Sequence, residues 1–253
     1  MKLNKIAALV AIAAASGTAF ATDGYFAHGY GMKAKGMGGA ATAMASDAMG
    51  GANNPASMVW AGDRLDVGLD LFAPKRSISR TGSGAVGIDG SSTSGSNLFY
   101  VPEFGYNKML GWDMSAGITV YGNGGMNTDY QGGELGNSPT CSNGPGGFNQ
   151  ASNQGGPYNL LCGAGKLGMN LEQLIIAPTF AMKVNKQHSF GGSLLIGYQK
   201  FRAYGLSSFY GYTPNAANPF GTNNFVTDRG DDTSWGYGLK FGWMGKVSDT
   251  VTL

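Results

Sequence analysis

The chain has 253 residues, of which 44 are glycine and 13% are charged, and its formal net charge is +2. Soluble domains contain about 7% glycine and about 25% charged residues, so this composition does not fit an ordinary soluble domain. The mean hydropathy of -0.11 is too low for a helical membrane protein. The small net charge offers no basic patch for a nucleic-acid partner, and we expect none.

Residues 1–21 have the features of a secretory signal peptide. Lys2 and Lys5 precede an apolar run at residues 6–15, and Ala19-Phe20-Ala21 provides a small-x-small cleavage site. The apolar run is about half of the roughly 20 residues that a membrane-spanning helix needs. We therefore expect an exported protein whose mature chain begins at Thr22.

Residues 22–62 are rich in glycine, alanine and methionine and show no alternation of polar and apolar residues. This stretch holds five of the 12 methionines: Met32, Met37, Met44, Met49 and Met58. Methionine is flexible and polarisable, so these side chains suit contact with varied apolar ligands. They equally suit filling the gaps between a plug and a surrounding wall.

From residue 64 onward, apolar residues recur at every second position in six segments. In the first segment, Leu65, Val67, Leu69 and Leu71 share one face, and Asp66, Gly68 and Asp70 share the other. The other segments are residues 98–107, 112–120, 173–183, 189–199 and 235–243. A shift of one residue would place Asp70, Glu103 or Lys240 on the apolar face, at a cost of about 2–4 kcal/mol for a lysine in mid-bilayer.

The connections between these segments alternate between long and short. They span residues 80–96, 107–111, 122–170, 185–188, 203–232 and 248–250. Outer-membrane barrels have short periplasmic turns and long extracellular loops in this order. We therefore expect residues 63–253 to form an all-β antiparallel transmembrane barrel of about six to seven strands. Residues 251–253 look like the opening of a further strand, so we expect the sequence to lack the closing half.

The two cysteines and the two histidines limit the chemistry. Cys141 and Cys162 lie in one Gly/Asn/Pro-rich stretch, and an exported protein is expected to bond them. No C-x-x-C motif or nearby histidine indicates a metal, and no cofactor is expected. His28 falls in the segment before the strands and His188 in a short turn, so neither supports a Ser/His hydrolase.

The run TDGYFAHGYGMKAKGMGGAATAMASDAMGGANNPASMVW at residues 22–60 resembles the hatch of the FadL family. These proteins transport long-chain fatty acids and aromatic hydrocarbons across the outer membrane. Similarity continues through RLDVGLDLFAPKR, LIIAPTFAMKVNKQHSFGGSLLIGY and WGYGLKFGW. The resemblance implies a 14-stranded barrel with residues 22–62 as a hatch inside it, capture of substrate by outer loops, and a sideways exit beside the third strand. The cysteine-bearing loop has no counterpart that we can match.

Several hatch residues are candidates for gating or anchoring. Asn54-Pro55-Ala56 matches the hatch motif of the family, and a purely structural corner explains it equally well. We hypothesise that Lys33 and Lys35 pair with inward-facing carboxylates and hold the hatch in place. The carboxylates are Asp66, Asp70, Glu103 and Asp113. Solvated charges lining a wet interior are the alternative.

Two prolines inside strands indicate a weak place in the wall. Pro102 and Pro178 lie at similar heights on either side of the third strand, level with Ala116 and Gly117. Proline cannot donate to a strand ladder, so a gap beside Gly117 would fit the sideways exit of the family. Two ordinary bulges would leave the same signature.

Candidate substrate-binding residues come from the hatch and from the aromatic loop at residues 203–232. They are Phe26, Met32 and Met44 in the hatch, and Phe209, Tyr210 and Phe220 in the loop. An exposed aromatic patch often marks a binding site, although loop packing also explains it.

The function that we predict is passive uptake of hydrophobic small molecules through a plugged barrel in the bacterial outer membrane. The expected partners are the substrate and outer-membrane lipid or lipopolysaccharide around a monomeric barrel. The alternatives are a general porin for polar solutes, which a hatch of about 40 residues disfavours, and an adhesin that acts through its loops.

Overall fold

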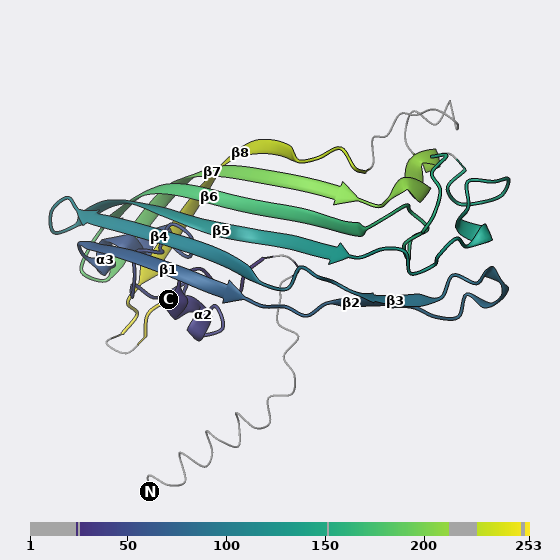
Figure 1. The fold of residues 1–253 in the computed structure, drawn as a ribbon. Coiled ribbons are helices and arrows are strands. Elements are labelled where there is room, and N and C mark those ends of the chain that lie inside the picture. Colours follow the sequence, from purple (N-terminus) through teal and green to yellow (C-terminus); the bar gives the residue numbers. More distant parts are fainter. Residues whose placement is uncertain (1–23, 25, 151, 213–226, 249–250) are drawn as a thin grey trace, which may run out of the picture.

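The computed structural model describes residues 24, 26–150, 152–212, 227–248 and 251–253. The predicted signal peptide and Phe220 therefore lie outside the described residues. The main element of the described structure is one antiparallel sheet of six strands (Figure 1). In spatial order the strands are β1 (Arg64–Phe72), β4 (Phe99–Met109), β5 (Met114–Tyr130), β6 (Leu167–Lys183), β7 (His188–Tyr204) and β8 (Asp232–Gly245). The predicted all-β antiparallel class is confirmed, and the sheet is a partial barrel that is not closed.

Two further strands and several short helical segments complete the described structure. β2 (Ser77–Arg80) pairs with β3 (Gly90–Thr93) as a separate hairpin beyond β1 and β4 (Figure 1). The helical segments are α2 (Met32–Gly36), η1 (Pro55–Ser57), α3 (Met58–Ala61), η2 (Gly84–Val86), η3 (Pro139–Cys141) and η4 (Ser207–Tyr212).

Among the described residues, no helix is both long and apolar enough to cross a membrane.

The six-stranded sheet exposes its apolar face and buries its polar one. Leu239 and Phe241 on β8 are 69% and 79% exposed, whereas Asn107 on β4 and Thr119 on β5 are fully buried. A water-soluble sheet has the opposite distribution, because burial of apolar area drives its folding. The exposed face, called the outer face here, therefore suits hydrocarbon. The strand faces predicted from the alternation are those of the structure, apart from Asp113, which lies before β5.

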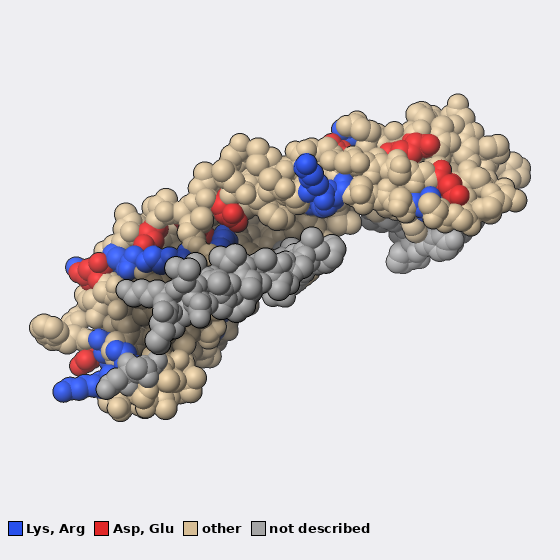
Figure 2. All heavy atoms as spheres, turned by 90° about the horizontal axis from the view of Figure 1, so that it is seen from below, with Lys and Arg blue, Asp and Glu red and all other residues tan. Residues whose placement is uncertain are grey.

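Charged side chains are sparse on the side of the molecule from which the inner face is seen. Figure 2 views the molecule from below and shows Lys, Arg, Asp and Glu gathered in a few patches on a largely uncharged surface. This distribution matches the low charged fraction of the chain.

β5 and β6 are longer than the alternation predicts. Each has 17 residues, and the predicted loop at residues 122–170 shrinks to residues 131–166. Glycines at 122, 124 and 125 lie within β5 because its pairing with β6 continues through them after a register shift between Gly122 and Gly124. Glycine has little intrinsic strand preference, and the ladder to β6 overrides it.

The connections alternate between short and long, as predicted. Residues 110–113 and 184–187 join strands at one end of the sheet, and residues 73–98, 131–166 and 205–231 join them at the other. The ends therefore differ as the periplasmic and outer rims of a barrel do.

The long connections are packed against one another. Cys141 and Cys162 form a disulfide within residues 131–166, and Tyr158 packs against it. The buried Asn149 donates hydrogen bonds to the carbonyls of both cysteines and accepts one of 2.7 Å from Ser207 Oγ in η4. This amide ties the disulfide-bonded loop to the connection between β7 and β8.

The outer face predicts how a charge there changes stability. Leu239→Arg places a guanidinium midway between Trp235 and Trp243 on β8, and we expect it to lower the free energy of unfolding in lipid vesicles by about 2–4 kcal/mol. Val247→Arg is the control, because Val247 is 60% exposed beyond the end of β8. Urea titration in vesicles measures both changes. Equal, small effects at the two positions would contradict a lipid-facing wall.

Candidate functional site

Residues 26–62, called the hatch here, lie against the buried polar face of the sheet, called the inner face. Glycines on the inner face leave room for the hatch backbone, because they have no side chain. Gly191 on β7 and Gly242 on β8 are cross-strand partners, and a Cβ on either would collide with Pro55 or Asn54. A Cβ on Gly105 of β4 would collide with Ala48 in the same way. Glycine is required at these positions because backbone and wall approach to contact distance.

Asn54 organises the corner where the hatch meets β7 and β8. Its Oδ1 accepts a hydrogen bond of 3.0 Å from the Ala56 amide and caps η1, where Pro55 takes the first position. Its Nδ2 donates to the carbonyls of Thr42 at 2.8 Å and Trp243 at 2.9 Å. The motif at residues 54–56 is thus an anchored corner, and its predicted gating role stays a prediction.

Lys35 bridges the hatch to two strands of the wall. Its Nζ lies 3.1 Å from Asp70 Oδ2 on β1 and 3.4 Å from Glu103 Oε2 on β4. Glu103 is 6% exposed and also accepts a hydrogen bond of 3.1 Å from the Gly31 amide. A buried carboxylate is stable only when it is paired, so these contacts bind both partners to the hatch.

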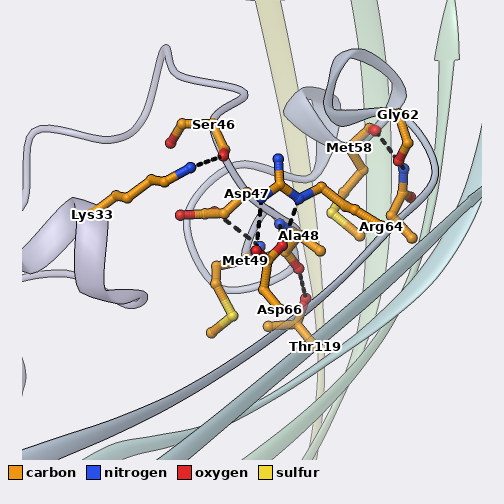
Figure 3. A network of polar contacts seen from close by, with 11 residues as sticks. Lys33, Ser46, Asp47, Ala48, Met49, Met58, Gly62, Arg64, Asp66 and Thr119 are labelled. Atoms are coloured by element: carbon orange, nitrogen blue, oxygen red, sulfur yellow. Dashed lines mark hydrogen bonds and ion pairs between the residues drawn. The ribbon is translucent and has the colours of Figure 1, made fainter.

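A second polar network holds residues 46–49 against β1 and β5 (Figure 3). The Ala48 amide donates to Asp66 Oδ2 at 2.8 Å, and Thr119 Oγ1 donates to the Ala48 carbonyl at 3.1 Å. Arg64 holds Asp66 in place through two hydrogen bonds of 2.6 and 2.7 Å. The backbone of Ala48 therefore contacts two strands of the wall, through its amide on one side and its carbonyl on the other.

Burial changes the acid strength of the carboxyl beside this network. Desolvation raises the pKa of Asp47 above its ordinary value, against the lowering effect of the hydrogen bond from the Met49 amide. The charges of Lys33 and Arg64 also lower it, and that of Asp66 raises it. Asp47 is therefore easier to protonate than a carboxyl in water.

Three parts of the predicted ion-pair set differ in the structure. The ion-pair partner of Asp66 is Arg64 on the same strand and not a lysine of the hatch. Asp113 is exposed in the turn between β4 and β5 and does not belong to the inner face, because β5 begins only at Met114. Lys33 donates to the carbonyl of Ser46 within the hatch rather than to the wall. Of the two lysines, Lys35 is the one whose ion pairs reach the wall.

The pairing of β4 with β5 ends early and leaves a stretch of β5 without ladder partners on β4, which is called the window here. The last pair is Glu103 with Tyr121, whereas β5 continues to Tyr130 on its other side against β6. At the outer end, the Asp129 amide donates to Ser94 Oγ at 3.0 Å, and its carbonyl accepts from the Gly95 amide at 2.8 Å. The window therefore lies along residues 122–128 of β5. The pair of Glu103 with Tyr121 bounds it at one end, and the hydrogen bonds of Asp129 to residues 94 and 95 bound it at the other.

The hatch occupies this window. Phe26 forms an antiparallel bridge with Gly124. Tyr30 Oη lies 3.0 Å from the carbonyl oxygen and 2.9 Å from Oδ1 of Asn123, the residue at the bulge, and the Tyr30 ring packs on Tyr121 with centroids 4.4 Å apart. Tyr30 and Asn123 were absent from the sequence predictions, because a tyrosine and an asparagine in glycine-rich segments carry no periodic signal.

The strands are paired at Ala116 and Gly117, where the sequence predicts a weak place, and the role of these residues in a sideways exit stays a prediction. Gly117 pairs with Asn107 on β4 and with Thr179 on β6, so the wall is continuous there. Pro102 lies next to Glu103, where the pairing with β5 ends, and Pro178 interrupts the ladder from β6 to β7 instead. The prediction placed the two prolines at the same height because they are equally far from the short turns. In the structure the strands are staggered, so Pro178 is level with Ile118 and Pro102 lies next to the pair of Glu103 with Tyr121.

The predicted substrate-binding residues do not share one cavity. Phe26 lies at the window, and Met32 lines a cavity of about 100 Å³ between hatch and β1. Met44 is 38% exposed. Phe209 and Tyr210 lie in η4 at the outer end, and Tyr210 lines a larger hollow there.

Trp60 closes the end of the hatch nearest the short turns, and the sequence reasoning did not single it out. The Nζ atoms of Lys183 and Lys246 lie 4.3 and 4.6 Å from the centre of its ring. Its Nε1 donates to Ser189 Oγ at 2.8 Å. Cation–π contacts on one indole fasten the hatch end to the wall. Within the described ranges, no three His, Cys, Asp or Glu residues are placed to hold a metal ion.

Three solved structures share this architecture. A FadL homologue of Pseudomonas aeruginosa is 13% identical with a TM-score of 0.53, over 90% of this chain and 51% of that one. The toluene transporter TbuX of Ralstonia pickettii is 17% identical with a TM-score of 0.59, over 88% and 55%. A mutant of the monoaromatic hydrocarbon channel TodX is 18% identical with a TM-score of 0.56, over 87% and 52%.

These likenesses establish the fold. The chain spans about half the length of each of the three structures. No family model matches the sequence. No curated protein matches it either.

The ion pairs of Lys35 predict a difference between two neighbouring lysines. Lys35→Met leaves the buried Glu103 without its cation, so we expect hatch amides to lose about 1–3 kcal/mol of protection in hydrogen exchange. Lys33→Met is the matched control, because its amine contacts only the hatch. Equal protection in the two variants would contradict the role of Lys35.

The glycine pair predicts a steric effect at one of two similar positions. Gly242→Ala brings a methyl group into Asn54, and we expect it to destabilise the docked hatch by about 1–3 kcal/mol. Gly238→Ala is the control, because its Cβ would meet only Leu195 at 3.8 Å. Limited proteolysis of the hatch, followed by mass spectrometry, measures docking. Cleavage at the same rate in both variants would show that the close approach is unnecessary.

Proposed function

We propose that the chain is part of a FadL-family channel that admits hydrophobic small molecules through the bacterial outer membrane. In this proposal residues 1–21 are a removed signal peptide, residues 22–62 the hatch domain and residues 63–253 the first part of a monomeric barrel. The protein carries out no reaction, and uptake is passive diffusion.

One observation carries the proposal: the hatch is docked in a framed window of a lipid-facing wall. A solute inside the barrel that passes residues 122–128 of β5 enters the hydrocarbon layer directly, without crossing water. Such a route favours apolar solutes, since they gain free energy on entering hydrocarbon. A polar solute gains nothing from it.

The end of the sheet with the short turns supports a sideways route. Trp60, with Lys183 and Lys246 on its ring, fastens the hatch across that end, and Asn107 donates to the carbonyls of Met58 and Gly62. These contacts oppose passage straight through, as a general porin would require. The proposed pathway therefore runs from the outer loops, along the hatch, to the window.

The substrates of two similar proteins support the substrate class. TbuX is described as a toluene transporter and TodX as a monoaromatic hydrocarbon channel. We extend the class of apolar small molecules to this chain, with Phe26, Met32 and Met44 as candidate contacts inside the barrel. Phe209, Tyr210 and Phe220 are candidate contacts at the outer loops.

Locking the hatch in the window tests the proposal. Phe26→Cys with Gly124→Cys places two thiols on bridge partners, and oxidation would fix the hatch to β5. We expect the oxidised protein to lose most uptake of labelled toluene and oleate by cells, and reduction to restore it. The readout is the initial rate of uptake.

A second cysteine pair controls for oxidation and reduction themselves. Leu194→Cys with Leu239→Cys joins two strands that are already paired, at a distance from the hatch. It should leave uptake unchanged under both conditions, and it also reports any effect of reducing the native disulfide. Undiminished uptake with the locked hatch would refute the window as the exit.

A further inference from the structure

A hollow of about 700 Å³ lies near the outer end of the sheet, apart from the hatch and next to the outer end of the window, which Asn127 lines as well. Its floor includes Asn127 on β5, Asn170 on β6 and Arg202 on β7, which are cross-strand neighbours in one row. Lys166 and Tyr210 come from the loops beside it. The lining is polar, unlike the apolar wall below.

The register places the floor of the hollow on the outer face. Leu174, Tyr198 and Trp235 form one cross-strand row, in which Leu174 and Trp235 are exposed and Tyr198 is half-buried. Asn170 and Arg202 are four residues further along β6 and β7, with unbroken pairing between the rows. Because strand side chains alternate with a period of two, Asn170 and Arg202 share the face of Leu174 and Tyr198.

The boundary of the apolar band lies just below the hollow. The rings of Tyr198 and Trp235 pack with centroids 5.0 Å apart, as in an interfacial aromatic girdle. The next outward row pairs Glu172 with Lys200, so charge replaces apolar surface within one step. The floor of the hollow is four residues beyond the aromatic row, or about 9–11 Å along the membrane normal for strands tilted by about 35–45°, which places it outside the hydrocarbon band.

Two cations of the hollow have capacity for a further partner. Arg202 Nε reaches Asp231 Oδ1 at 3.8 Å, and its side chain is 45% exposed. Lys166 Nζ lies 3.1 Å from Asp129 Oδ2, and its side chain is 53% exposed. Arginine has five donors and lysine three, so each single ion pair leaves donors available to an oxyanion.

The other polar side chains of the hollow are suited to hydrogen bonds with the hydroxyl groups of a sugar. Asn127 Nδ2 donates to Asn170 Oδ1 at 2.7 Å, and Asn170 Nδ2 donates to Glu172 Oε1 at 2.8 Å, which fixes the orientation of both amides. Tyr204 Oη donates to the Thr128 carbonyl at 2.8 Å, and the Arg202 guanidinium lies over its ring. Fixed amides beside tyrosine rings and cations match a phosphorylated saccharide.

We propose that this hollow binds the phosphorylated saccharide headgroup of a lipopolysaccharide in the outer leaflet. Arg202 and Lys166 contact phosphate, and Asn127 and Asn170 contact sugar hydroxyls. The occupant follows from the depth of the hollow, its outward orientation and its exposed cations. The inference rests on the membrane orientation of the proposed function, but not on transport.

Binding of lipid A by the purified protein in detergent tests the proposal. The probes are lipid A with its phosphates and the same lipid after their removal, titrated by calorimetry. Lys166→Gln with Arg202→Gln should weaken binding of the phosphorylated lipid by about tenfold or more and leave binding of the other unchanged. Lys108→Gln is the matched control, since Lys108 is 55% exposed and paired with Asp63 at the opposite end.

Three results would overturn the assignment. They are equal affinity of the double variant and the unaltered protein, equal weakening by Lys108→Gln, and full competition by inorganic phosphate, which would make the ligand a soluble oxyanion. If the double variant fails to fold, Arg202→Gln alone is titrated in the same way. Toluene uptake is measured in parallel: phosphate-dependent binding without uptake by the unaltered protein would refute the channel and leave the lipid site standing.

Discussion

The fold depends on one constraint, which is that its sheet has its apolar face outside and its polar face inside. The outer face needs hydrocarbon, and the inner face needs partners for groups such as Asn107, Thr119 and Glu103. The hatch supplies many of them from its own backbone, through the carbonyls of Met58, Gly62 and Ala48 and the amide of Gly31. The hatch is therefore part of what makes the wall stable, rather than a separate plug placed in a finished barrel.

The hatch is attached differently on its two sides. Against β7 and β8 it fits over a glycine pair, and Asn54 spans from Thr42 to the wall, so any shift costs close packing as well as hydrogen bonds. At the window it meets β5 through the bridge of Phe26 and the hydroxyl of Tyr30 at a bulge. The hatch is therefore closely packed against β7 and β8, whereas at the window it is held by one bridge and by the hydrogen bonds and ring contact of Tyr30.

The outer end of the molecule separates polar from apolar recognition. The disulfide-bonded loop, Asn149 and η4 form one packed unit above the wall. The hollow around Arg202 faces outward from the sheet, whereas the hatch and Phe26 lie on its inner side. The two regions meet at Asn127, which belongs both to the floor of the hollow and to the outer part of the window.

The sequence by itself determined the strand faces, the alternation of short and long connections, and the inward placement of Asp66, Asp70 and Glu103. These features follow from local order, since side chains of a strand alternate whatever its neighbours are. Only the tertiary structure decided the stagger between strands, and with it the window beside residues 122–128 rather than at Gly117. It also decided the partners of Lys33 and Lys35, the roles of Tyr30 and Trp60, and the extension of β5 through its glycines. Each of these depends on which segments meet in space, and a period of two residues carries no information about that.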